Sequence, residues 1–150
     1  GLSTILSDKK IRLSHVIRHS RIPGLCYLSA GPVPDDALAL LRTQRFVQVI
    51  ASLAKYFNNI VIDSPPVLCV PDYMPLCHVA RRVVMVVRQG QTLREEVRKS
   101  ASLMRSVPGT KIIGVLLNRA PLSHGRYSSS RSARSPYRYS YYERYYSRAS

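Results

Sequence analysis

The sequence has 150 residues, of which 45% are hydrophobic, and it carries 23 lysines and arginines against eight acidic residues. That hydrophobic content supports one compact domain and excludes two ordinary ones, and the formal charge of +15 predicts a surface that attracts anions such as phosphates, nucleic acid or acidic lipid headgroups. The apolar runs are far shorter than the roughly 20 residues that a membrane-spanning helix needs. The three cysteines lack the spacing of a disulfide framework or a zinc site.

The first half of the chain predicts one short strand and one long helix. The sequence opens with Gly-Leu-Ser-Thr, without an initiator Met or a signal-like stretch, and we therefore expect it to begin inside a longer protein. Residues 25–29 predict a strand that ends at Ala30-Gly31-Pro32. Apolar side chains recur at roughly helical spacing over residues 35–56, which predicts a helix with Asp35 or Asp36 as its cap.

The second half predicts strands that alternate with a helix. The β-branched run at residues 59–62 stops at Asp63 and Pro65-Pro66, a pattern typical of a strand followed by a sharp turn. Residues 83–87 and 111–117 predict two more strands, and residues 92–107 predict an amphipathic helix between them. Continuous apolar strands that alternate with helices predict an α/β fold whose parallel β-sheet is covered on both faces.

The composition changes abruptly near Pro121. From Leu122 onward the residues are almost entirely Ser, Arg and Tyr, so this stretch buries too little apolar surface to offset its chain entropy. We expect a folded domain over residues 1–121 and a disordered tail over residues 122–150. Seven of the ten tyrosines lie in this tail: Tyr127, Tyr137, Tyr139, Tyr141, Tyr142, Tyr145 and Tyr146.

The most informative acidic residue is Asp63, which follows the predicted strand at residues 59–62. Ligands of parallel α/β sheets bind beyond the carboxyl ends of the strands, where a carboxylate can reach a Mg²⁺ ion that bridges nucleotide phosphates. The alternative is that Asp63 only initiates a turn. The Pro-Pro pair and a second acid, Asp72, favour the metal-binding interpretation.

Several motifs together resemble those of one protein family. Residues 57–68, which read Phe-Asn-Asn-Ile-Val-Ile-Asp-Ser-Pro-Pro-Val-Leu and are followed by Val70-Pro71-Asp72, are similar to the apolar-Asp-Ser/Thr-Pro-Pro segment of deviant P-loop ATPases. In its long form this segment resembles the bacterial tyrosine kinases of capsule and exopolysaccharide systems. Three further segments resemble the same family: Gly31-Pro32-Val33-Pro34 with Leu40-Leu41, residues 83–88, and residues 114–119. The tail tyrosines are also typical of it.

The resemblance implies a role for each candidate residue. Asp63 is then the Walker B acid that holds Mg²⁺, with Ser64 beside it, and Asp72 lies on a mobile segment and positions the metal or the attacking hydroxyl. Asn118 contacts the adenine of ATP and Arg119 flanks the base, although Asn118 is alternatively a residue that merely ends a strand. The seven tail tyrosines are the phosphorylation sites.

The family also implies an activity and partners. It predicts an ATP-dependent protein-tyrosine autokinase that regulates exopolysaccharide and capsule synthesis and export, assembles into a ring that phosphorylates its own tails in trans, and binds a membrane-anchored activator or polysaccharide co-polymerase. We expect it in the cytoplasm, at the inner face of the plasma membrane, through a partner or an upstream segment. The sequence departs from the family in lacking the Walker A loop, and Asn58 stands where the family has Asp. We therefore expect an incomplete P-loop domain that is inactive alone.

Two other functions remain as alternatives. The tail interleaves arginines with tyrosines, which is also typical of a disordered RNA-binding segment, although we do not expect nucleic acid to be the main partner. A partition-type or division-site ATPase is the other alternative, but such proteins lack clustered tail tyrosines. The histidines, His15, His19, His78 and His124, are interpreted as surface or capping residues, and Cys69 and Cys77 as small packing residues.

Overall fold

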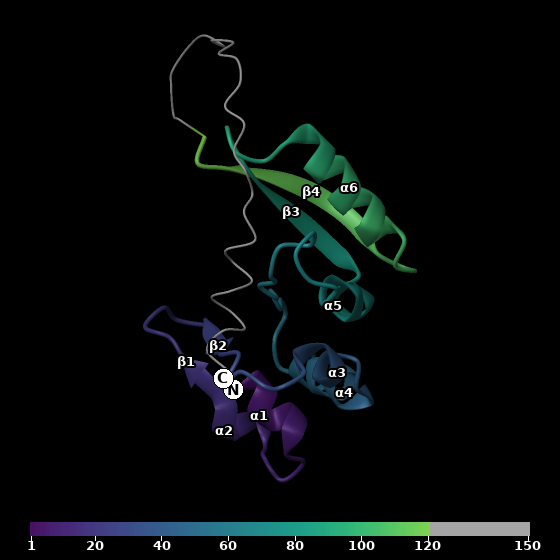
Figure 1. Ribbon diagram of the computed structural model, residues 1–150. Helices are drawn as coiled ribbons and strands as arrows, with labels where there is room; N and C mark the ends of the chain where they lie inside the picture. The colour runs from purple at the N-terminus through teal and green to yellow at the C-terminus, as the bar shows by residue number, and fades with distance from the viewer. Residues whose placement is uncertain (121–150) are drawn as a thin grey trace. The chain divides into compact units, whose positions relative to one another are not determined.

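The computed structural model describes residues 1–120, so the predicted tail, its seven tyrosines and His124 lie outside the described residues. The described chain forms two compact units, which we call the N-terminal unit, residues 1–63, and the C-terminal unit, which starts at Ser64 and is described to residue 120 (Figure 1). Over residues 1–120, no helix has the length and apolar character required to cross a membrane.

The N-terminal unit is a small helical cluster with one antiparallel hairpin. Its elements are α1 (Leu2–Ser7), α2 (Leu13–Val16), β1 (Ile17–His19), β2 (Cys26–Leu28), α3 (Ala37–Leu41) and α4 (Gln44–Leu53). β1 and β2 pair with Ile17 opposite Leu28, so the strand predicted at residues 25–29 is confirmed. The buried side chains are Ile5, Leu6, Val16, Phe46, Val49 and Leu53.

The helix predicted over residues 35–56 is interrupted, and Thr43 is the reason. Its hydroxyl donates to the Leu40 carbonyl oxygen at 2.7 Å, and its Oγ1 accepts from the Phe46 N–H at 3.4 Å. The first contact lies at the C-terminal end of α3. The second caps the N-terminus of α4, because the threonine side chain satisfies an otherwise unpaired N–H. The prediction of one continuous helix is therefore wrong. The cap prediction is confirmed for Asp36, whose Oδ1 accepts from the Ala39 N–H at 2.8 Å.

The strand predicted at residues 59–62 does not form. Residues 59–66 have no regular secondary structure, and Val61 is 94% exposed. A strand requires a neighbour to satisfy its backbone groups, and the two sheets of residues 1–120 pair only β1 with β2 and β3 with β4. The prediction that Asp63 stands at the tip of a buried strand is therefore wrong for this structure.

The C-terminal unit contains the parallel sheet. Its elements are α5 (Tyr73–Ala80), β3 (Arg82–Arg88), α6 (Arg94–Arg105) and β4 (Lys111–Asn118). β3 and β4 pair in parallel from Arg82 opposite Lys111 to Arg88 opposite Asn118, with Ile113 as an extra residue in a β-bulge. The strands predicted at residues 83–87 and 111–117 and the helix predicted at residues 92–107 are confirmed.

Helix α6 is well specified at both ends and packs along one face of the β3–β4 pair (Figure 1). At its start the Glu96 carboxylate accepts from the Leu93 N–H at 2.8 Å, which is half of a capping box. Acidic residues in the first turn and Arg105 in the last turn complement the helix dipole. From its inner side Met104, 2% exposed, packs against Cys77 and Met85.

The opposite face of the β3–β4 pair is open. Val84, Val86 and Leu116 are 53%, 62% and 56% exposed, although β-branched and aliphatic strands of this kind are normally buried on both sides. The α/β class is thus confirmed, whereas the predicted covering of both faces is not found within residues 1–120.

Candidate functional site

β3 ends at Arg88 and β4 ends at Asn118, directly opposite it. Asn118 and the following Arg119 are two of the predicted nucleotide-binding residues. The Gln89 N–H donates to the Asn118 carbonyl oxygen at 3.0 Å, and the Arg119 N–H donates to Asn118 Oδ1 at 2.8 Å. The second bond uses the side-chain oxygen of Asn118 as acceptor. The Nδ2 group has no partner within residues 1–120 and remains available to a ligand. This is the edge of a parallel sheet at which ligands bind.

Arg119 leaves the strand in a left-handed conformation, with φ at 56°. A non-glycine residue rarely adopts this conformation, and it redirects the chain at the sheet edge. Both Asn118 and Arg119 are exposed. A strand-ending amide next to an exposed guanidinium can offer hydrogen-bond donors and a planar cation to a ligand with π and acceptor character, such as a nucleobase.

Sequence reasoning missed a loop on the same edge. After β3, the Arg88 N–H donates to Thr92 Oγ1 at 3.1 Å and the Thr92 N–H donates back to the Arg88 carbonyl oxygen at 3.0 Å. Gly90 supplies the left-handed residue that this turn needs, with φ at 74°. The loop begins at Arg88, which the strand register places opposite Asn118. The rule that ligands lie at carboxyl strand ends could have identified it, because residues 88–92 directly follow a predicted strand.

Asp63 and Ser64 are neighbours in an exposed segment at the boundary of the two units. They belong to different units, and the structure does not bring Asp63 together with Asn118 and Arg119 in one unit. A carboxylate and a hydroxyl side by side are oxygen donors of the kind that Mg²⁺ prefers, and exposure leaves room for the several waters that this ion retains. No cluster of three or more His, Cys, Asp or Glu residues is found between Gly1 and Ala120.

Asp72 occupies the N-cap position of α5 and is half-buried. Beside it is a shallow hollow of about 270 Å³, lined by Val67, Leu68, Cys69, Val70, Pro71, Tyr73, Lys99 and Leu103. Lys99 is the charged residue of this set, and sequence reasoning did not associate it with Asp72. The negative Asp72 at the helix start and the positive Lys99 in the hollow could together orient a polar substrate group.

Cys77 is a packing residue, as the sequence predicted, whereas Cys69 and Cys26 are half-buried. Cys77 is 5% exposed, and this burial raises the pKa of its thiol. The neighbouring Thr110 hydroxyl lowers the pKa of this thiol, but by less than burial raises it. The Thr110 hydroxyl has no hydrogen bond of standard geometry within residues 1–120. Cys26 Sγ lies 3.3 Å from His19 Nδ1 across the hairpin, a contact that the sequence did not reveal.

No family model matches the chain, but individual proteins do. CapB of Staphylococcus aureus is 30% identical over 122 residues, which are 81% of this chain and 53% of CapB. The tyrosine-protein kinase CpsD of Streptococcus pneumoniae is 29% identical over 127 residues, which are 85% of this chain and 55% of CpsD. The chain thus spans about half the length of these curated relatives.

Solved structures of tyrosine kinases are also similar to this chain. The chimerical protein CapA2B2 superposes with a TM-score of 0.75 at 31% identity, covering 81% of this chain and 53% of the other. The kinase domain of the Escherichia coli tyrosine kinase ETK superposes with a TM-score of 0.73 at 26% identity, covering 87% and 52%. The fold of the chain therefore matches about half of these kinase structures. The chain is a homologue of the bacterial tyrosine-protein kinases and corresponds to a C-terminal portion of that family.

Proposed function

We propose that this chain is the C-terminal half of an ATP-dependent protein-tyrosine kinase domain that phosphorylates its own tail. The observation that carries the proposal is its similarity to tyrosine-protein kinases over more than four fifths of its length. The parallel β3–β4 pair adds support, because Asn118 and Arg119 stand at the sheet edge that binds ligands in this fold class.

In this proposal each candidate residue has a distinct task. Asp63 and Ser64 hold Mg²⁺, which neutralises phosphate charge when bound. Asn118 and Arg119 bind and orient the adenine, and Asp72 orients the tyrosine hydroxyl. Phosphoryl transfer depends mainly on such positioning and charge stabilisation. Because a Gly-x-x-x-x-Gly-Lys loop is absent from the 150 residues, the phosphate cradle has to come from other residues, and the chain alone is inactive.

The tail tyrosines are the proposed phosphate acceptors, and the inner membrane face is the proposed place of action. The acceptors are the seven tyrosines between Tyr127 and Tyr146, presented to a neighbouring subunit in a ring. The relatives' names support the tyrosine-kinase activity. As the sequence resemblance implies, the kinase would serve capsule or exopolysaccharide synthesis and work at the inner membrane face with a membrane-anchored partner. The kinase names of the relatives do not favour a partition-type ATPase.

The test removes the metal-binding carboxylate in a complete domain. The part of CpsD that lies outside the 127 matched residues is joined ahead of Gly1, and autophosphorylation with Mg-ATP is measured. We expect Asp63→Asn to slow it on the order of 100-fold, because a preorganised charge at the phosphates is lost. Asp35→Asn, which removes another exposed carboxylate, should leave the rate unchanged. Equal rates for the two variants would refute the assignment.

The same proposal predicts the behaviour of the chain by itself. Titration calorimetry of the 150-residue chain with Mg-ATP should give no binding in the micromolar range, whereas the joined protein should bind. Micromolar affinity of the chain alone would mean that the nucleotide site lies elsewhere. Retention of RNA at moderate salt by the chain but not by residues 1–120 would instead favour a nucleic-acid-binding tail.

A further inference from the structure

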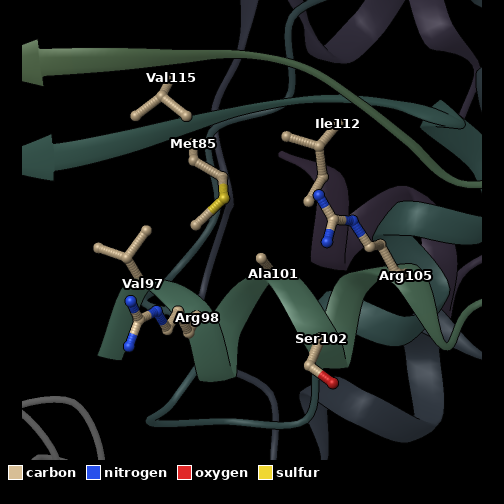
Figure 2. A pocket seen from close by; sticks show the side chains of 8 residues that line it. All are labelled: Met85, Val97, Arg98, Ala101, Ser102, Arg105, Ile112 and Val115. Carbon is tan, nitrogen blue, oxygen red and sulfur yellow. The ribbon is translucent and has the colours of Figure 1, made fainter. Parts of the chain in front are cut away.

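A groove of about 460 Å³ lies between α6 and the β3–β4 pair. Its lining residues are Met85, Val97, Arg98, Ala101, Ser102, Arg105, Ile112 and Val115. Figure 2 shows Ala101 pointing from the helix toward the strands, with Met85 and Val115 on the strands above it. The floor of the groove is thus apolar, and all of it belongs to the C-terminal unit.

The groove exists because α6 covers only part of its face of the sheet. Met85 is 9% exposed beneath the helix, whereas Val115, which is opposite Met85 in the strand register, is 60% exposed. Leu117 lies two residues further on the same face and is 54% exposed. Helix α6 packs near Met85 of β3 and Ile112 at the start of β4, whereas Val115 and Leu117 further along β4 are more than half exposed within residues 1–120. Apolar strand faces of this kind mark a surface that another element packs against.

The rim of the groove is positively charged. Arg98 and Arg105 stand seven residues apart on α6, which is about two helical turns, and both line the groove. Both are exposed, and no carboxylate within residues 1–120 pairs with either. An element that fills the groove therefore gains most if it has an apolar stripe and acidic side chains along its flank.

We propose that this groove binds an acidic amphipathic helix that belongs to the half of the kinase domain outside these 150 residues. The matched residues are 55% of CpsD and 52% of the ETK kinase-domain chain, so nearly as many residues again complete a domain of this kind. The helix lies beside α6, covers Val115 and Leu117, and pairs its acids with Arg98 and Arg105. The inference rests on the proposed function.

The experiment measures association without nucleotide. The full 150-residue chain is mixed with a separately produced polypeptide that contains the part of CpsD outside the matched residues, and binding is followed by calorimetry and sedimentation. We expect a 1:1 complex that Val115→Lys weakens by about 10-fold or more, because a charge enters an apolar contact. The double variant Arg98→Glu/Arg105→Glu should weaken it too, and this effect should fade as salt is raised.

Matched controls lie in the N-terminal unit. Ile22→Lys makes the same kind of change at a side chain that is 63% exposed, and Arg12→Glu/Arg18→Glu reverses two exposed arginines. Both should bind like the wild type, and circular dichroism should show that every variant is folded. Absence of a wild-type complex at 100-fold molar excess, or equal weakening by the control variants, overturns the proposal.

Two further results separate this proposal from its alternatives. If the chain alone dimerises and Val115→Lys makes it monomeric, the occupant is a second copy and the proposal is wrong. If the complex forms as expected but shows no kinase activity, the groove assignment stands and the proposed function fails. Binding therefore tests the groove, and catalysis tests the kinase assignment independently.

Discussion

A single glycine, Gly31, holds helix α1 against the turn that precedes α3. Its φ is 87°, and a Cβ placed there would collide with the Ser3 hydroxyl. The same turn holds α1, since the Leu2 and Ser3 N–H groups donate to Ser29 and Ala30 carbonyl oxygens, each at 2.8 Å. The turn therefore depends on a residue without a side chain.

Gly31→Ala is expected to destabilise the chain by about 1–3 kcal/mol, through left-handed backbone strain and through displacement of Ser3. Gly24→Ala is the control, because Gly24 also has a positive φ, 77°, but no atom lies within 4 Å of its Cβ position. Urea denaturation of both variants should show a larger loss for Gly31→Ala. Equal losses would mean that the contact with Ser3 contributes nothing.

The buried thiol of Cys77 is expected to make the stability of the fold depend on pH. Burial raises the pKa of its thiol above the ordinary value of 9.0, so the unfolded chain releases this proton at lower pH than the folded chain. The stabilisation is complete below about pH 9 and is lost as pH rises through the folded-state pKa. The free energy of unfolding should fall above pH 9 more steeply for the wild type than for Cys77→Ala, and parallel curves would contradict the prediction.

At the scale of elements, the α3–α4 junction depends on a capping side chain. Thr43→Ala removes the hydroxyl that serves both helices and should lower the free energy of unfolding by about 1 kcal/mol. Ser52→Ala, which removes a hydroxyl that donates to the Gln48 carbonyl oxygen inside α4, should be nearly neutral, because alanine is the better helix former. Helical signal and denaturation midpoints are measured for both variants, and equal midpoints would show that the cap contributes nothing.

At the scale of the whole molecule, the tail beyond Pro121 is predicted to act as a charge switch. Its six arginines and one glutamate give a formal charge of +5. Each phosphotyrosine adds about −1.5 to −2, so four of them would add about −6 to −8 and reverse the sign. Reversal should release tails from acidic sites of neighbouring subunits and dissociate the ring.

Sedimentation of the joined protein, with and without ATP, tests this switch. Phosphorylated wild type should be smaller than the unmodified form, and a variant with all seven tail tyrosines changed to Phe should stay assembled. If both have the same assembly state over a range of salt, the switch is refuted, and the tail is only an acceptor of phosphate or a nucleic-acid-binding extension.

The local elements followed from the sequence wherever neighbouring residues suffice. β3, β4 and α6 are each encoded by a run or a periodicity of adjacent side chains, and the Asp36 cap needs only the next turn of helix. These elements depend on contacts within a few residues. Asn118 and Arg119 were predicted as site residues from the resemblance to a kinase family, and they lie where β4 ends, opposite the end of β3.

Features that need distant partners could not be predicted from local sequence patterns, because packing between remote segments determines them. Residues 59–62 have the pattern of a strand, but a ladder requires a neighbour that residues 1–120 do not supply, so Asp63 is exposed in an irregular segment. The contacts of Gly31 with Ser3 and of Cys26 with His19 join residues that no local pattern associates. The groove above Val115 likewise depends on how far α6 extends across two strands. Periodicity specifies which side of an element is apolar, whereas packing determines what covers it.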